Sequence, residues 1–135
     1  VHDMRLYKSA AELRIMQQAA SISADAHTRA MKFCRPGMME YELEAEYLHE
    51  FSSRGAQAAA YNSIVGAGKN ACILHYIDNN KECKDGDILL MDFGAEYANY
   101  ASDLTRCIPV SGRFTARQKE VYNAALKLKG KEDES

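Results

Sequence analysis

The chain has 135 residues, of which 47% are apolar, and its formal net charge is −2 from 17 basic and 19 acidic side chains. This length suits one domain with a real core, and the charge excludes the basic surface that nucleic acids or anionic membranes attract. No apolar run approaches the roughly 18 residues that span a bilayer. Four scattered cysteines without a C-x-x-C pair fit reduced thiols better than a zinc site or disulfides. We therefore expect a cytoplasmic protein with no nucleic-acid or membrane partner.

Two amphipathic helices are expected first. Ser9 and Glu12 form a capping box that opens a helix to about Phe33, before Pro36-Gly37. Its apolar stripe comprises Ile15, Ala19, Ile22, Ala26, Ala30 and Phe33. A second helix spans Glu40 to about Ser53; its buried side carries Leu43, Tyr47 and Phe51, and its solvated side Glu40, Glu42, Glu46 and Glu50. His27 is interpreted as a surface or packing residue, and His49 receives no role.

Two short strands with a glycine-rich loop between them follow. Ala59–Val65 and Cys72–Tyr76 have strand composition, and Gly66-Ala67-Gly68 forms the loop. This loop alone is a weak signal for phosphate, because no Lys-Ser/Thr pair follows it. His75, at the end of the second strand, could bind a ligand or transfer a proton. A hydrogen-bonded loop histidine without such a role is the commoner case.

A hairpin over Met91–Arg106 is the most informative segment. The apolar run before Asp92 and the run after Asp103 predict two strands, and residues 96–99 predict the turn. A turn centred between Tyr97 and Ala98 places Asp92 directly across from Asp103, where like charges repel. Two opposed carboxylates call for a cation, and a pair of divalent metals satisfies both. The alternative is that each Asp only shapes a turn or caps a helix.

One more helix is expected after the hairpin. Thr115 caps a helix from Ala116 to about Lys129, whose apolar side carries Val121, Ala125 and Leu128. Pro109 places the preceding strand near an edge. Residues 129–135 are highly charged and are expected to form a solvated or disordered tail. The fold class is therefore α/β (α+β), a mostly antiparallel sheet covered by helices.

The segments from about Lys8 to Leu126, taken together and in order, resemble the pita-bread metallopeptidases, and among them most closely the Xaa-Pro aminopeptidase (aminopeptidase P) family. The segments that carry the resemblance are Tyr61–Gly66, Ile73–Tyr76 with Asn79-Asn80, Asp87–Asp92, Tyr100–Arg106 and Pro109–Thr115. The resemblance implies a partial pita-bread fold. It also implies a metal-dependent aminopeptidase that removes the N-terminal residue from peptides beginning Xaa-Pro.

The resemblance also implies roles for three residues. Asp92 would bind one metal of a dinuclear manganese site, and Asp103 would bridge both metals, with other divalent metals as alternatives. His75 would contact the substrate beside the scissile bond and help stabilise the developing oxyanion. The metals would activate water and polarise the carbonyl that precedes proline.

The family's complete site has five protein ligands, and only the two Asp have counterparts in this chain. No histidine follows Asp103, and the later acids lie in the last helix and the charged tail. Residues 1–128 are thus expected to form the first half of a pita-bread catalytic domain, with little activity alone. The expected partners are a peptide with proline at its second position and either the C-terminal half of the domain or a second copy of the chain. The alternative function is a non-catalytic pita-bread module that binds peptides or proteins.

Overall fold

The computed structural model describes residues 2–133. The helices are α1 (His2–Leu6), α2 (Ala10–Phe33), α3 (Glu40–Ser53), the 3-10 helix η1 (Gly68–Cys72) and α4 (Ala116–Asp133). The strands are β1 (Ala58–Ala59), β2 (Ile64–Ala67), β3 (Ile88–Phe93), β4 (Ala95–Tyr97), β5 (Tyr100–Ala101) and β6 (Leu104–Pro109). The predicted α/β class is confirmed.

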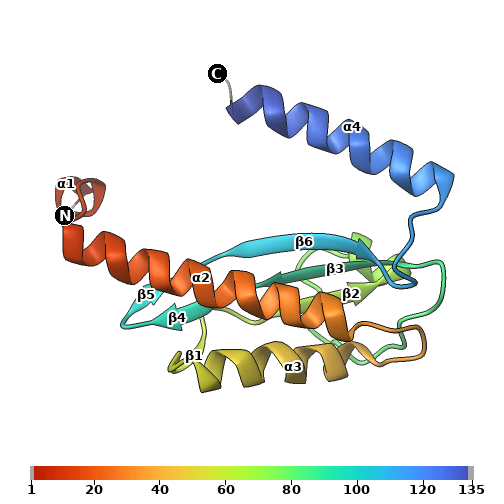
Figure 1. Ribbon diagram of the computed structural model, residues 1–135, viewed down its shortest axis with the longest axis horizontal. Coiled ribbons are helices and arrows are strands. Elements are labelled where there is room, and N and C mark those ends of the chain that lie inside the picture. The colour runs from red at the N-terminus through yellow and green to blue at the C-terminus, as the bar shows by residue number, and fades with distance from the viewer. Residues whose placement is uncertain (1, 134–135) are drawn as a thin grey trace.

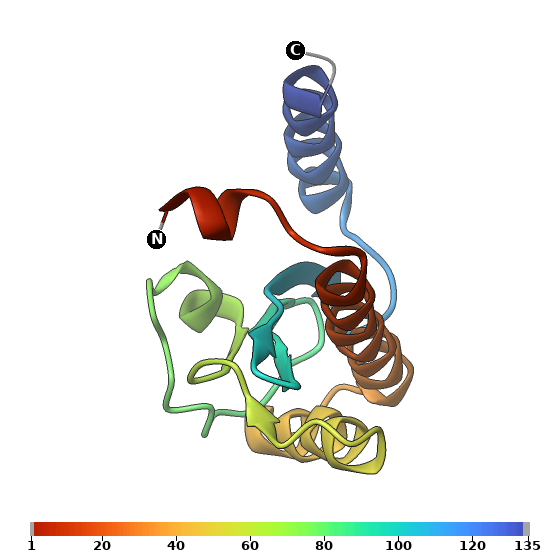
Figure 2. The same cartoon turned by 90° about the vertical axis from the view of Figure 1, so that its left-hand side faces the viewer.

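The strands form two small antiparallel sheets, in the orders β1-β4-β5 and β2-β3-β6. The segment from β3 to β6 contributes to both sheets, because β4 and β5 belong to the first and β3 and β6 to the second. Helices α2 and α3 pack together and against the strands, whereas α4 projects away from the body (Figures 1 and 2). The helices therefore cover one side of the sheet, and its other side faces outward.

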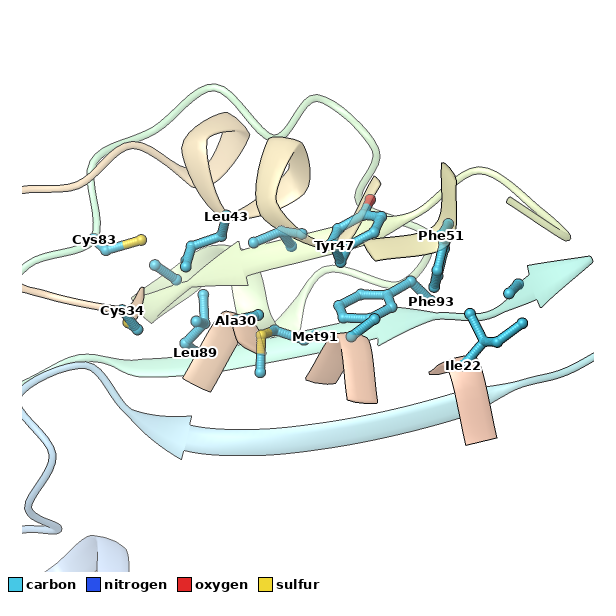
Figure 3. Close-up of a cluster of buried hydrophobic side chains, with 14 of the residues drawn as sticks. Ile22, Ala30, Cys34, Leu43, Tyr47, Phe51, Cys83, Leu89, Met91 and Phe93 are labelled. Carbon is cyan, nitrogen blue, oxygen red and sulfur yellow. The ribbon is translucent and has the colours of Figure 1, made fainter. Parts of the chain in front are cut away.

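The core lies between the two helices and the central strand β3. Leu89, Met91 and Phe93 point from β3 into this core and are fully buried. They meet Ile22 from α2 and Tyr47 from α3, and the Phe93 ring stacks on Tyr47 with centroids 3.8 Å apart (Figure 3). The alternating residues Ile88, Leu90 and Asp92 are only half-buried, because a strand sends successive side chains to opposite faces. One strand thus serves both the core and the outward face.

The first two predicted helices are confirmed, and so is the capping box of the first. Ser9 Oγ accepts a hydrogen bond from Glu12 N at 3.2 Å, and Glu12 Oε2 accepts one from Ser9 N at 2.7 Å. The stripe from Ala19 to Ala30 is buried, but Phe33 is 51% exposed because it lies in the last turn, beyond the core. His27 is a packing residue, since its buried ring stacks on Phe93 and its Nε2 bonds the Leu104 carbonyl at 2.9 Å.

The assignment of Glu40 to the solvated side of its helix is wrong, because Glu40 is fully buried. The predicted strand Ala59–Val65 is also wrong in part: β1 ends at Ala59, and a loop separates it from β2. Cys72–Tyr76 is not a strand but the end of η1 and a turn. The chain folds back over β2 at η1, and Gly66 in β2 permits this close approach. A Cβ at Gly66 would lie 2.8 Å from the Asn70 carbonyl oxygen, so only glycine fits there.

The last predicted helix is confirmed at its start and continues beyond its expected end. Thr115 Oγ1 accepts a hydrogen bond from Gln118 N at 3.2 Å and so caps α4. The helix continues to Asp133, through most of the expected charged tail, and residues 134–135 lie outside the described part. The expected apolar side of α4 is not packed, since Val121 and Leu128 are more than half exposed.

Candidate metal centre

Asp92 and Asp103 lie on either side of a break in the hairpin. Gly94 marks the break: a Cβ at this position would lie 1.7 Å from the Ser102 carbonyl oxygen, so only glycine allows this approach. Behind the break, Ala95 N donates to Ser23 Oγ of α2 at 2.9 Å, and Ser102 N donates to the Ala95 carbonyl at 3.0 Å. These bonds fix the backbone one residue before Asp103.

The predicted pairing of the two aspartates is wrong in register but right in face. Asp92 pairs with Thr105, not with Asp103. The turn is centred between Ala98 and Asn99, whose φ angles of 49° and 69° both lie in the left-handed region, as a type I′ turn requires. Because the turn is displaced by one residue, the residue opposite Asp92 changes by two positions, from Asp103 to Thr105. Side chains along a strand alternate between its two faces, so a displacement of two positions keeps the same face. Both carboxylates therefore remain on the same side of the hairpin, as diagonal neighbours.

A single hydroxyl joins the two carboxylates. Tyr61, from the loop between β1 and β2, approaches Asp92 Oδ1 at 2.6 Å and Asp103 Oδ1 at 3.0 Å. Burial, followed by the hydrogen bond to Asp92, raises the pKa of Tyr61 well above its usual range, so the phenol keeps its proton at neutral pH. One proton satisfies only one carboxylate at a time. The second carboxylate is left with capacity for a positive charge.

All three residues singled out from the sequence line one cavity of about 460 Å³, which also contains Tyr61 and the apolar side chains Ile64 and Ile77. His75 enters it from a turn, with φ 56°. A second depression of about 280 Å³ shares His75 and Asp92 and is bordered by Ile73 and Leu74. Leu74 is 85% exposed, so the rim beside His75 is apolar.

The residues present fit one part of a divalent-metal site. Carboxylate oxygens are hard ligands suited to divalent cations, and neither aspartate forms an ion pair with Lys or Arg within residues 2–133. In the same residues, no group of three His, Cys, Asp or Glu side chains is arranged to hold a metal. A metal ion held by Asp92 and Asp103 would therefore need further ligands from elsewhere.

The sequence prediction misses two residues that make long-range contacts around the predicted site. The sequence identifies Tyr61 only as part of a segment that resembles the family, and a tyrosine between two strands gives no local sign that it contacts two aspartates. Its contacts span 31 and 42 residues of the chain. Glu40, which accepts hydrogen bonds from Tyr76 Oη and Lys81 N on either side of residues 77–80, looks from the sequence like one more acid in a polar helix.

The geometry agrees with the comparison to known families. The profile of Metallopeptidase family M24 matches residues 14–131, most of the chain. The chain belongs to metallopeptidase family M24. The sequence-based family assignment is thus confirmed.

Similar sequences cover this M24 chain almost completely. It is 54% identical to the Xaa-Pro aminopeptidase of Escherichia coli over 126 residues, 93% of this chain and 29% of the relative. It is 40% identical to the human Xaa-Pro dipeptidase over 130 residues, 93% of this chain and 26% of the relative. The chain therefore spans less than a third of the length of these curated relatives.

Solved structures show the same fold. Proline aminopeptidase P II from Yersinia pestis superimposes with a TM-score of 0.91 at 56% identity, over 93% of this chain and 29% of that chain. A zinc-substituted E. coli aminopeptidase P in complex with product gives a TM-score of 0.90 at 53% identity, over 92% and 28%. The M24 chain thus has the corresponding part of the pita-bread fold. Within residues 2–133, no helix is both long and apolar enough to cross a membrane.

Proposed function

We propose that this chain supplies two metal ligands, Asp92 and Asp103, and one substrate-contacting residue, His75, to the active site of a dinuclear-metal aminopeptidase that removes the N-terminal residue from peptides beginning Xaa-Pro. The observation that carries the proposal is the carboxylate pair joined by Tyr61, with His75 lining the same cavity. The relatives named above, an Xaa-Pro aminopeptidase and an Xaa-Pro dipeptidase, support the substrate class.

The protein groups have separate roles in this proposal. Asp92 and Asp103 hold the cations, and Tyr61 keeps the two carboxylates in place. Bound divalent metals supply positive charge that lowers the pKa of water and polarises a carbonyl. His75, at the mouth of the cavity, donates a hydrogen bond to the substrate beside the bond that is cleaved, where negative charge develops. The apolar rim at Ile73, Leu74 and Ile77 contacts apolar parts of the peptide.

We propose manganese as the metal, with other divalent cations as substitutes. Oxygen ligands suit manganese, and a similar structure is described as zinc-substituted. We also propose that the protein works in the cytoplasm, because all four cysteines are free and Cys34 and Cys83 are buried thiols.

In this proposal, residues 1–128 represent the first half of the catalytic domain, and the remaining ligands come from its second half. An apolar cavity of about 370 Å³ between α4 and the outward face of the sheet supports an association there; it is lined by Ile88, Cys107, Phe114, Arg117, Gln118, Val121, Tyr122 and Ala125. Exposed apolar patches mark interaction surfaces. The chain alone should therefore self-associate, and a strictly monomeric mass in light scattering at high concentration argues against this.

The activity is tested in the full-length protein that contains this chain. With Mn²⁺ it should hydrolyse an Xaa-Pro peptide, and Asp103→Asn should abolish turnover. Asp85→Asn, an exposed aspartate in a distant turn, is the matched control and should leave kcat unchanged. The purified 135-residue chain should show no turnover, because two carboxylates hold a divalent ion weakly. Normal activity of Asp103→Asn refutes the mechanism, and peptide binding without turnover favours the non-catalytic module.

A further inference from the structure

Glu40 is a buried carboxylate outside the cavity that holds the two aspartates. Its Oε1 accepts hydrogen bonds from Ala67 N at 2.9 Å and Asn70 Nδ2 at 3.1 Å. Its Oε2 accepts from Tyr76 Oη at 2.6 Å and Lys81 N at 3.0 Å. A buried charge without partners is very costly, whereas hydrogen bonds to a charged acceptor are short and strong. The four bonds therefore make Glu40 a strong anchor.

These four donors belong to one continuous segment. Ala67 ends β2, Asn70 lies in η1, and Tyr76 and Lys81 lie in the loop that follows. His75 is the direct neighbour of Tyr76, so the anchor acts one residue away from the histidine that enters the cavity. Burial, followed by the hydrogen bond to Glu40, raises the pKa of Tyr76 to about 12, so its hydroxyl remains a donor.

The backbone around His75 needs such an anchor. His75 and Asn79 have φ angles of 56° and 50°, in the left-handed region. A non-glycine residue in this region persists only where the surrounding structure holds it. Asn79 is held separately, since its Oδ1 accepts from Val65 N at 2.9 Å and its Nδ2 donates to the Ser63 carbonyl at 2.9 Å. On the side of His75, the bonds to Glu40 fill this role.

We propose that Glu40 is a positioning residue, which acts through Tyr76 to hold His75 over Asp92 and Asp103. The inference rests on the proposed function, because it assigns Glu40 to the reaction that His75 assists. Glu40 itself touches neither the cavity nor the two aspartates. Its effect on the reaction must therefore pass through His75, and this requirement makes the proposal testable.

The test is a double-mutant cycle in the full-length protein. Tyr76→Phe removes one hydrogen bond from Glu40 and leaves the other three. In the presence of His75 it should lower kcat by roughly 10- to 100-fold, because misplacement of a reacting group by 1 Å can cost about 100-fold, and KM should stay within about twofold. In a His75→Ala background the same change should have no further effect on kcat. Glu40→Gln should act in the same direction.

Tyr100→Phe is the matched control, since Tyr100 Oη donates to Glu12 Oε1 at the same distance of 2.6 Å, in a contact remote from His75. It should leave kcat unchanged. An equal loss of kcat for Tyr76→Phe in both backgrounds means a general structural role and overturns the proposal. An unchanged kcat in the presence of His75 overturns it too.

Hydrogen exchange separates this inference from the proposed function. In the 135-residue chain, Tyr76→Phe should raise amide exchange of residues 75–81 by at least about tenfold, as local opening becomes easier, with α2 unaffected. If the full-length protein shows no Xaa-Pro activity, the proposed function fails. Amide exchange then decides separately whether Glu40 holds the segment around His75. Unchanged protection of residues 75–81 in Tyr76→Phe refutes the proposal that Glu40 positions this segment through Tyr76.

Discussion

Replacing Gly94 with alanine tests whether the close approach within the hairpin positions the proposed metal ligands Asp92 and Asp103. A Cβ at Gly94 would lie 1.7 Å from the Ser102 carbonyl oxygen and 2.5 Å from its carbon, while real Cβ contacts essentially never fall under 3.0 Å. The obstacle is backbone on both sides, so no side-chain rotation relieves it. The two strands must therefore move apart by more than an ångström, immediately before Asp103.

The expected loss of stability follows from the bonds beside Gly94. The Gly94 carbonyl accepts from Ala60 N at 2.8 Å, and the Ala95 carbonyl accepts from Ser102 N at 3.0 Å. Each such bond contributes about 0.5–1.5 kcal/mol, and overpacking at a tight site costs about 1–3 kcal/mol. Gly94→Ala should thus lower the free energy of unfolding by about 2–6 kcal/mol.

Urea unfolding of the 135-residue chain measures this change. Gly130→Ala is the matched control, because a Cβ there meets nothing within 4 Å in helix α4, and it should stabilise by about 0.5–1 kcal/mol. Metal affinity of the full-length Gly94→Ala protein should also fall, since Asp103 moves. If Gly94→Ala has the same urea midpoint and the same dependence of the unfolding free energy on urea as the unchanged chain, the reasoning is refuted.

Three further predictions concern His27, Tyr61 and Ser9. Burial lowers the pKa of His27 below its usual 6.5. Below about pH 6.5 the unfolded chain therefore binds a proton that the folded chain does not, and the free energy of unfolding falls as the pH falls. Urea unfolding measured from pH 7.5 to pH 5 should show this fall in the unchanged protein and a smaller one in His27→Gln. Tyr61→Phe should weaken binding of Mn²⁺ to the full-length protein by about 10- to 100-fold in calorimetry, because groups that orient metal ligands typically contribute this much; unchanged affinity contradicts the role. Ser9→Ala removes the cap of α2 and should destabilise the chain by about 1 kcal/mol, whereas Ser21→Ala, at an exposed position inside the same helix, should not destabilise it.

The helices could be predicted closely because their signals are local. The capping box at Ser9 and the spacing of Leu43, Tyr47 and Phe51 lie within a few residues of the structure they determine. The shared face of Asp92 and Asp103 was also predictable, because the period of a strand tolerates a shift of two residues. The exact pairing was not, since Ala98 adopts a left-handed conformation that its residue type does not favour.

The segment around His75 was misread because its structure depends on distant partners. Ile73 and Leu74 resemble a buried strand, yet they are exposed beside the cavity. The bond from Tyr76 to Glu40 spans 36 residues. No local pattern distinguishes the fully buried Glu40 from its partly buried neighbours Glu46 and Glu50, which pair with Arg29. Long-range polar contacts therefore limit what the sequence alone reveals about this site.

The alternation along β3 gives the strand two kinds of sensitivity. Leu89, Met91 and Phe93 face the core, while Asp92 lies between two of them and faces the cavity. Because Phe93 follows Asp92 directly on the same strand, a substitution that repacks the core at Phe93 should also shift the Asp92 carboxylate. Core packing and the proposed metal site are therefore coupled through neighbouring residues of β3, although their side chains lie on opposite faces.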